Sequence, residues 1–65
     1  MEITVNGVQE SCSPCSLAQL VAAKELAAQS LVIELNQQII KQELWESTSL
    51  RDGDVLELLS FVGGG

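Results

Sequence analysis

Residues 1–8 read Met-Glu-Ile-Thr-Val-Asn-Gly-Val, and this opening stretch decides the class of fold. Ile3 and Val5 alternate with polar residues, which is the two-residue period of a half-buried β-strand. Asn6-Gly7 then predicts a two-residue type I′ turn, because both residues tolerate positive φ. The chain is therefore expected to begin with a β-hairpin whose second strand covers residues 8 to about 12.

The second strand of this hairpin places an acidic residue on the core side. A regular register pairs Glu10 with Ile3, which belongs to the face that should be buried. Because burying an unpaired carboxylate costs free energy, we expect a β-bulge or a frayed strand end at this point.

One amphipathic helix is expected after the hairpin. Ser16-Leu17-Ala18-Gln19 fits a capping box, with Ser as the N-cap and Gln three residues later. Leu17, Leu20 and Val21 then fall at helical spacing and form one apolar stripe. No Gly or Pro follows as a stop signal, so the helix is expected to end somewhere in residues 26–29.

Three more strands are expected in the second half of the chain. Residues 31–35 alternate with apolar side chains inward, and a turn at Asn36-Gln37 leads into a short strand over residues 38–40. The last strand is expected over residues 55–62. It follows Asp52-Gly53-Asp54, which we interpret as a tight turn because it lacks the further ligands that calcium needs.

The order of these elements predicts an α+β domain. A helix after a hairpin supplies the crossover that a parallel strand pairing requires. We therefore expect a mixed sheet of four to five strands with one main helix packed on one face. Residues 42–46 are expected to form a single helical turn that buries Leu44 and Trp45. The domain is expected to cover residues 1–62, with residues 63–65 as a flexible glycine tail.

The last strand is expected to carry apolar side chains on both faces. The glutamate at its third position should face solvent, which turns Leu56, Leu58 and Val62 inward. Leu59 and Phe61 then lie on the outward face. Such a pair is either covered by the protein's own loops or left for a partner. Since contiguous exposed apolar residues mark interaction sites, Leu59 and Phe61 are predicted to dock a partner.

The composition excludes several classes of function. A net charge of −6 in 65 residues repels phosphate backbones, so no nucleic-acid partner is expected. A basic partner protein would be attracted to the same charge. No apolar run approaches the roughly 18 residues of a membrane span. No signal peptide is recognised, so we expect a cytoplasmic protein without a membrane partner.

The chain has few residues that catalyse reactions. It contains no His and no Tyr, which removes the commonest general base. We therefore expect no catalytic residue, and a carrier or binding role rather than an enzyme.

Cys12-Ser13-Pro14-Cys15 is the other motif that could carry chemistry. In a cytosolic protein C-x-x-C can be a redox pair, and Cys15 would stand just before a helix N-terminus. Two Cys and no His cannot complete a zinc site within one chain, so no metal site is expected. The simpler alternative is that Cys12 packs as a small apolar residue and Cys15 is an ordinary loop residue.

Taken as a whole, the chain resembles the ThiS family of sulfur carriers, which are ubiquitin-like proteins of the β-grasp fold. The matching features, in order along the chain, are the turn at Asn6, the helix cap at Ser16, Leu35-Asn36-Gln37-Gln38-Ile39-Ile40, Trp45, Asp52-Gly53-Asp54 and the terminal Val62-Gly63-Gly64-Gly65. The chain departs from the family pattern at Lys41, where the family often has Pro.

This resemblance implies that Gly65 carries the sulfur. An adenylating enzyme would use ATP and Mg²⁺ to activate the Gly65 carboxylate, and a cysteine desulfurase system would supply the sulfur. The resulting thiocarboxylate would serve a thiazole synthase in thiamine biosynthesis. Gly63 and Gly64 would thread into the partner's active site, and the carrier itself would bind no cofactor.

Three other functions stay open at this stage. Two share the fold and the terminal glycine chemistry: a carrier like the small subunit of molybdopterin synthase, and a ubiquitin-like protein modifier. The third is a plain interaction module with no chemistry at its tail.

Overall fold

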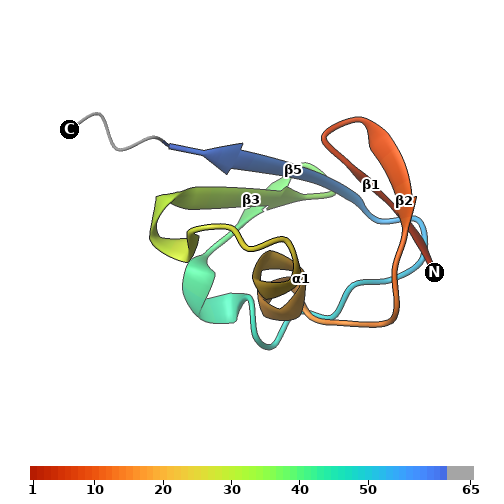
Figure 1. Ribbon diagram of the computed structural model, residues 1–65, viewed down its shortest axis with the longest axis horizontal. Coiled ribbons are helices and arrows are strands. Elements are labelled where there is room, and N and C mark those ends of the chain that lie inside the picture. Colours follow the sequence, from red (N-terminus) through yellow and green to blue (C-terminus); the bar gives the residue numbers. More distant parts are fainter. Residues whose placement is uncertain (62–65) are drawn as a thin grey trace.

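A five-stranded mixed sheet in the order β2-β1-β5-β3-β4 is covered on one face by the helix α1 (Figure 1). The structure is a computed structural model, and it describes residues 1–61. The strands are β1 (Glu2–Val5), β2 (Val8–Ser11), β3 (Leu31–Leu35), β4 (Gln38–Ile40) and β5 (Val55–Ser60). The helical segments are α1 (Leu17–Ala23) and the short 3₁₀ turns η1 (Ala28–Ser30) and η2 (Gln42–Leu44). The predicted β-grasp arrangement is confirmed.

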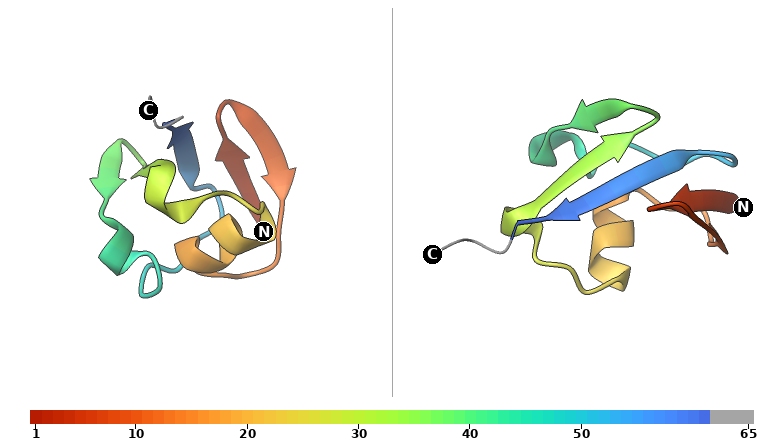
Figure 2. Two further views of the ribbon diagram at one scale, coloured as in Figure 1. Left: turned by 60° about the vertical axis from the view of Figure 1, so that its left-hand side comes forward. Right: turned by 90° about the horizontal axis from the view of Figure 1, so that it is seen from above.

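The last strand, β5, occupies the centre of the sheet. It pairs in parallel with β1, where Val5 lies opposite Leu56, and antiparallel with β3, where Val32 lies opposite Leu59. The helix α1 carries the chain from the β1–β2 hairpin to β3, on the other side of β5. Figure 1 and the left view of Figure 2 show α1 beneath the sheet.

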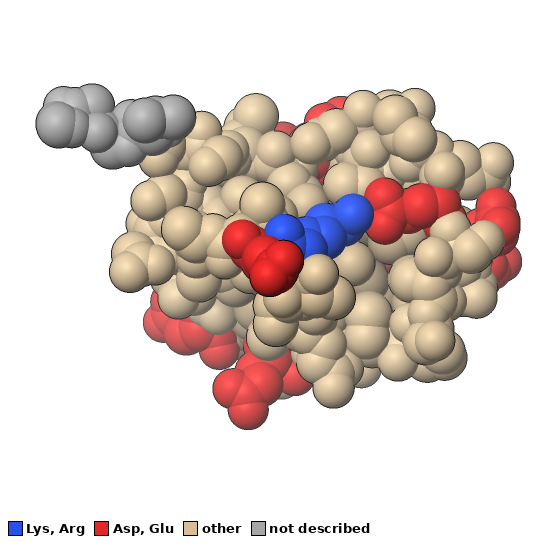
Figure 3. Space-filling model, viewed as in Figure 1, with Lys and Arg blue, Asp and Glu red and all other residues tan. Residues whose placement is uncertain are grey.

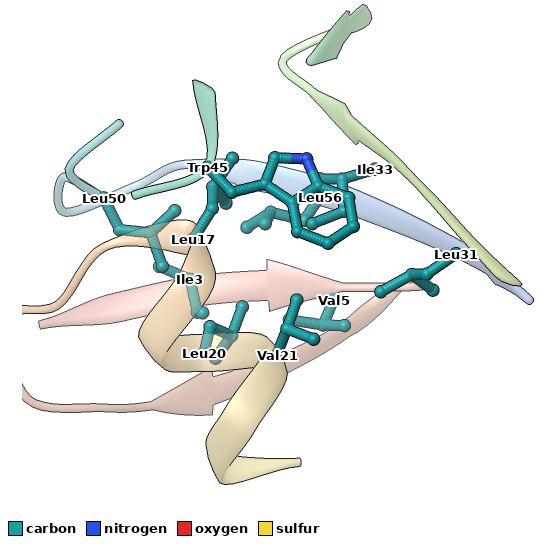
Figure 4. Close-up of a cluster of buried hydrophobic side chains, with 10 residues drawn as sticks. All are labelled: Ile3, Val5, Leu17, Leu20, Val21, Leu31, Ile33, Trp45, Leu50 and Leu56. Atoms are coloured by element: carbon teal, nitrogen blue, oxygen red, sulfur yellow. The ribbon is translucent and has the colours of Figure 1, made fainter. Parts of the chain in front are cut away.

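The core lies between α1 and the sheet face that it covers (Figure 4). As predicted, the odd-numbered residues of β1 and β3 and Leu56 of β5 face inward, and Leu35 and Leu58 are half-buried. The predicted helix stripe meets them from below. The buried side chains are Ile3, Val5, Leu17, Leu20, Val21, Leu31, Ile33, Trp45, Leu50 and Leu56.

The β1–β2 hairpin keeps a regular register, so the bulge or frayed end expected at Glu10 is wrong. Glu10 lies opposite Ile3, and its carboxylate is 2.9 Å from Nζ of Lys24 at the end of α1. Because β2 is an edge strand, the Glu10 side chain can reach past the core to this lysine. In Figure 3 a basic side chain lies between acidic ones on the side of the molecule where α1 lies. The strand itself ends at Ser11, one residue earlier than expected.

Both predicted hairpin turns are confirmed. Asn6 and Gly7 have φ of 50° and 81°, which is the positive pair that a type I′ turn requires. Asn36 and Gln37, between β3 and β4, have φ of 49° and 72°. The β3–β4 turn therefore holds a glutamine in the left-handed region, which glycine normally occupies.

The helix α1 begins as predicted but ends earlier. The Ser16 side chain accepts a hydrogen bond from the Gln19 amide, and the Gln19 side chain accepts one from the Ser16 amide, which completes the capping box. The helix ends at Ala23 rather than within residues 26–29, because Glu25 adopts φ of 56°. The amide of Glu25 donates to the Ala22 carbonyl at 3.1 Å.

A second hydrogen bond completes this C-terminal cap. The amide of Leu26 donates to the Val21 carbonyl at 3.2 Å, and together the two bonds form a Schellman motif. The left-handed position of this motif usually holds Gly, so a glutamate there leaves no signal in the sequence.

The segment after β4 buries only one of its two large apolar residues. Trp45 is buried and its Nε1 donates to the Ile40 carbonyl at 2.9 Å. The expected burial of Leu44 is wrong, since this side chain is 49% exposed. The expected helical turn over residues 42–46 is a single 3₁₀ turn, in which adjacent side chains point about 120° apart. Leu44 and Trp45 therefore cannot both face the core.

The end of β5 is held on both sides. The Asn6 side chain continues the β1–β5 pairing, since its Oδ1 accepts from the Leu58 amide at 2.7 Å and its Nδ2 donates to the Leu58 carbonyl at 3.3 Å. On the other side the Phe61 amide donates to the Ser30 carbonyl at 2.6 Å. The strand ends at Ser60. The expected inward position of Val62 lies outside the described residues, as does the expected tail.

Replacing Glu25 by Gly should stabilise the protein by about 0.5–1 kcal/mol. The left-handed conformation costs a residue with a side chain about 1–2 kcal/mol, and glycine's extra freedom in the unfolded chain offsets part of that gain. The matched control is Ala23→Gly, two residues earlier at the last position of the helix, which should lower stability by up to about 1 kcal/mol. Urea unfolding measures both changes. A loss of stability in Glu25→Gly similar to that in Ala23→Gly would contradict the C-cap assignment.

Replacing Asn6 by Gly should lower the free energy of unfolding by about 1–2 kcal/mol. Glycine keeps the turn conformation but removes both side-chain hydrogen bonds to Leu58. Amide hydrogen exchange at Leu58 should become faster. Asn6→Asp retains the acceptor for the Leu58 amide and should preserve more of its protection. Unchanged exchange at Leu58 in Asn6→Gly would show that the side chain does not secure this strand.

Candidate functional site

The predicted docking residues lie at the end of β5, on the face of the sheet that α1 leaves uncovered. Leu59 is 55% exposed and Phe61 is 58% exposed. Because side chains alternate along a strand, the buried Leu56 and the half-buried Leu58 force Leu59 outward. The outward orientation expected for Leu59 and Phe61 is therefore present, while their role in docking stays a prediction.

Neighbouring strands extend this apolar surface. Val32 lies directly opposite Leu59 in β3, and Ile39 of β4 and Val55 at the start of β5 also point outward. Ile39 is 68% exposed and Val55 is 47% exposed. We call the five residues Val32, Ile39, Val55, Leu59 and Phe61 the outer patch. Its first three members were not predicted from the sequence, because only the register of the β3–β4 hairpin and of β3–β5 brings them to the same face.

Two carboxylates lie on the same face as the outer patch. Glu34 of β3 lies directly opposite Glu57 of β5. Glu34 is half-buried and Glu57 is exposed. Sequence reasoning placed Glu34 and Glu57 on outward faces but did not bring them together, because that requires the pairing of β3 with β5.

The residues that would carry the sulfur chemistry follow directly after this surface. The structure holds β5 in place as far as Phe61, through the Phe61–Ser30 hydrogen bond. The predicted threading residues Gly63 and Gly64 and the predicted sulfur-bearing Gly65 lie outside the described residues.

Cys12 lies beside the N-terminus, at the other end of the molecule from the end of β5. Cys12 exchanges two hydrogen bonds of 2.9 Å with Met1, one through each residue's backbone nitrogen. The N-terminus and the end of β5 lie at opposite ends in Figure 1, separated by the length of β5, about 20 Å. Cys12 is therefore too far away to act on a group at the end of β5 within one chain.

Both thiols are free, half-buried and packed against the core. Burial raises the pKa of the Cys15 thiol, and the neighbouring Cys12 raises it further. A raised pKa lowers the thiolate fraction at neutral pH, and the thiolate is the reactive form. These observations favour the packing role for Cys12 and Cys15 over a redox pair.

The turn Asp52-Gly53-Asp54 is confirmed as a structural turn. Gly53 has φ of 88°, and Asp54 accepts hydrogen bonds from the Arg51 amide at 2.8 Å and from Asn36 Nδ2 at 3.0 Å. The Asp52 carboxylate accepts from the Glu2 amide at 2.7 Å. Both carboxylates therefore hold backbone and turn geometry.

The described part of the chain offers no set of metal ligands. Within residues 1–61, His, Cys, Asp and Glu side chains do not gather in any group of three that could hold a metal. A hollow of about 690 Å³ lies beside α1 and is lined mainly by small residues such as Pro14, Ala18 and Ala22. No helix in this part of the chain is long and apolar enough to cross a membrane.

Comparison with known proteins identifies relatives along the whole chain. The model of the ThiS family matches residues 1–65. The uncharacterized protein ycf40 of Pyropia yezoensis is 36% identical over 66 residues, which cover 100% of this chain and 93% of that protein. The sulfur carrier protein ThiS of Bacillus subtilis (strain 168) is 36% identical over 50 residues, covering 77% of this chain and 76% of that protein.

A solved structure matches the fold as well as the sequence. The crystal structure of the thiamine biosynthesis protein ThiS from Geobacter metallireducens has a TM-score of 0.86 and 33% sequence identity to this chain, and the match covers 100% of both chains. With a family match over all 65 residues, and relatives that agree in sequence and in fold, this chain belongs to the ThiS family.

Proposed function

We propose that this chain is a sulfur carrier in thiamine biosynthesis and that the carboxylate of Gly65 bears the sulfur. Membership of the ThiS family supports the proposal, since the Bacillus subtilis relative is named a sulfur carrier protein and the Geobacter relative a thiamine biosynthesis protein. The observation that carries it is the exposed apolar surface at the end of β5, which the sequence continues directly into Val62-Gly63-Gly64-Gly65.

The proposed chemistry begins with activation of a carboxylate. Charge delocalisation makes a carboxylate a poor electrophile, so an adenylating enzyme would join the Gly65 carboxylate to AMP, with ATP and Mg²⁺ as its own reactants and pyrophosphate as the product. The terminal sulfur of a persulfide, supplied by a cysteine desulfurase system, would then displace AMP. Cleavage of the resulting sulfur–sulfur bond by a thiol leaves a thiocarboxylate. A thiazole synthase would receive this sulfur.

In this proposal the carrier is a protein cosubstrate and not an enzyme. The partners supply the nucleotide, the metal and the acid–base groups, which agrees with a chain that contains no His. Gly63 and Gly64 have no side chains, so they would enter a narrow active site without steric conflict. We propose that the carrier acts in the cytoplasm.

The outer patch would hold the carrier on its partners while the tail reaches their active sites. Protein interfaces use apolar centres of this kind, and a few residues dominate their binding energy. Leu59 and Phe61 adjoin the tail along the chain, so docking through them would set the distance from the interface to Gly65.

Removing Gly65, or adding one alanine after it, should abolish activation without unfolding the domain. Either change moves the terminal carboxylate by one residue, and misplacement of a reacting group by about 1 Å can already lower a rate about 100-fold. ATP–pyrophosphate exchange with the adenylating enzyme measures activation, and urea unfolding verifies the fold.

A second experiment identifies the chemical product at the C-terminus. Co-expression of the unmodified chain with the adenylating enzyme and a sulfur donor should exchange one terminal oxygen for sulfur, as seen in the intact mass. Normal pyrophosphate exchange by the extended variant would refute the role of Gly65. Amide-linked conjugates to other proteins would instead indicate a protein modifier.

Leu59→Ser and Phe61→Ser should each weaken docking to the adenylating enzyme by about 10-fold or more, because central apolar residues dominate interfaces. Their stability should change by less than about 1 kcal/mol, since both side chains are more than half exposed. Isothermal titration calorimetry measures docking. Val8→Ser is the matched control, because Val8 is 64% exposed but lies on the edge strand β2, outside the outer patch.

A substitution in the core shows how large the loss of stability would be for a buried residue. Leu56 is completely buried, so Leu56→Ser should destabilise the domain by at least about 2–5 kcal/mol. If Leu59→Ser lost as much stability as Leu56→Ser, Leu59 would belong to the core and not to a docking surface.

A further inference from the structure

The outer patch adjoins the two carboxylates of Glu34 and Glu57. These residues are direct partners in the β3–β5 pairing, and such partners have Cβ atoms about 4.5–5.5 Å apart on the same face of a sheet. The next outward pair along the two strands is Val32 and Leu59. On the other side of Glu34, its direct partner in β4 is Ile39.

Apolar side chains flank the acidic pair along β5 and at Ile39, while Glu57 itself stays exposed. Val55 precedes Glu57 by two residues and points to the same face, so the pair has an apolar neighbour at each end along β5. Apolar neighbours displace water, and charges interact more strongly where water is displaced. An opposite charge placed between the two carboxylates would therefore be held more firmly here than on an open surface.

The free protein leaves the pair without a counter-charge. Like charges directly opposite each other in a sheet are destabilising. Within residues 1–61 the single ion pair joins Lys24 to Glu10, on the other side of the sheet from Glu34 and Glu57. The fold therefore keeps two like charges side by side among the exposed apolar residues of the outer patch.

We infer that Glu34 and Glu57 together receive an arginine of the adenylating enzyme that docks on the outer patch. The inference rests on the proposed function and adds a charged centre to the apolar docking surface. Arginine fits better than lysine, because its planar guanidinium has five N–H donors and can bind two carboxylates at once. The partner's docking face would then combine apolar side chains with one central cation.

The charges on this face disfavour the other occupants. A second copy of this chain would bring four carboxylates together, and each copy has a net charge of −6. A nucleic acid would place phosphates against the same pair. A basic protein surface is the occupant that complements both the charge and the apolar area.

For a single substitution in the acidic pair, we expect the stability of the free carrier to rise and its affinity for the partner to fall. Glu57→Gln removes the repulsion in the free carrier and should raise its urea midpoint. The same change removes half of the site for the arginine and should weaken docking about 10-fold or more, because a charged partner loses its counterpart in a desolvated contact. Glu34→Gln should behave in the same way. A residue that serves only the fold would move both measurements in the same direction.

The experiment uses the full chain and the adenylating enzyme, with docking measured by calorimetry at low and high ionic strength. The matched control is Glu43→Gln, which makes the same change in net charge on η2, beside α1 and away from the outer patch. We expect Glu43→Gln to leave docking within about 2-fold, since rim and remote charges contribute little. The Glu34 and Glu57 variants should also show a smaller salt dependence of docking than Glu43→Gln.

The outcomes separate this inference from the proposed function. If Leu59→Ser weakens docking while Glu34→Gln and Glu57→Gln bind like the parent chain, the arginine site is refuted and the docking surface stands. If Glu43→Gln weakens docking as much as Glu57→Gln, overall charge is responsible and the site is again refuted. If none of these variants affects docking, the outer patch is not the docking face, and that part of the proposed function fails with it.

Discussion

The parallel pairing of β1 with β5 is the constraint on which the rest of the structure depends. Parallel neighbours cannot be joined by a tight turn, so all of the chain between β1 and β5 has to cross the sheet and return. That detour places α1 under one face and β3–β4 beyond β5. The last strand thereby becomes the central one, and the chain leaves the sheet from its middle rather than from an edge. Asn6 extends the pairing by two more hydrogen bonds.

A central last strand suits a carrier whose reactive group is at its end. β5 is held by β1 and Asn6 on one side and by β3 on the other, as far as Phe61. A partner that binds the outer patch therefore binds the same strand that leads to the proposed reactive carboxylate. In the proposed function the domain supplies position, and the partner enzymes supply the chemistry.

Local patterns in the sequence predicted most of the fold. Alternation, the two turns with positive φ and the capping box at Ser16 each involve neighbours within about four residues, and the structure confirms them. The predictions were wrong where a contact between distant residues, or an unusual backbone conformation, determines the structure. The Lys24–Glu10 ion pair replaces the expected bulge, and Glu25 takes a conformation that Gly usually fills. For the site, Leu59 and Phe61 could be predicted from one strand, whereas the Glu34–Glu57 pairing needs the register of two.

The acidic pair also explains how the unbound protein can expose an apolar face without associating with wrong partners. An apolar patch on a small domain favours association with any similar patch, including that of a second copy. Two carboxylates at its centre cost stability in the free chain, but they cost more in any contact that does not supply a cation, because there they lose water without gaining a partner. The correct partner is then selected because it supplies a cation that other surfaces lack. On this argument Glu34 and Glu57 reduce wrong association more than they strengthen right association, since the apolar residues around them supply most of the affinity.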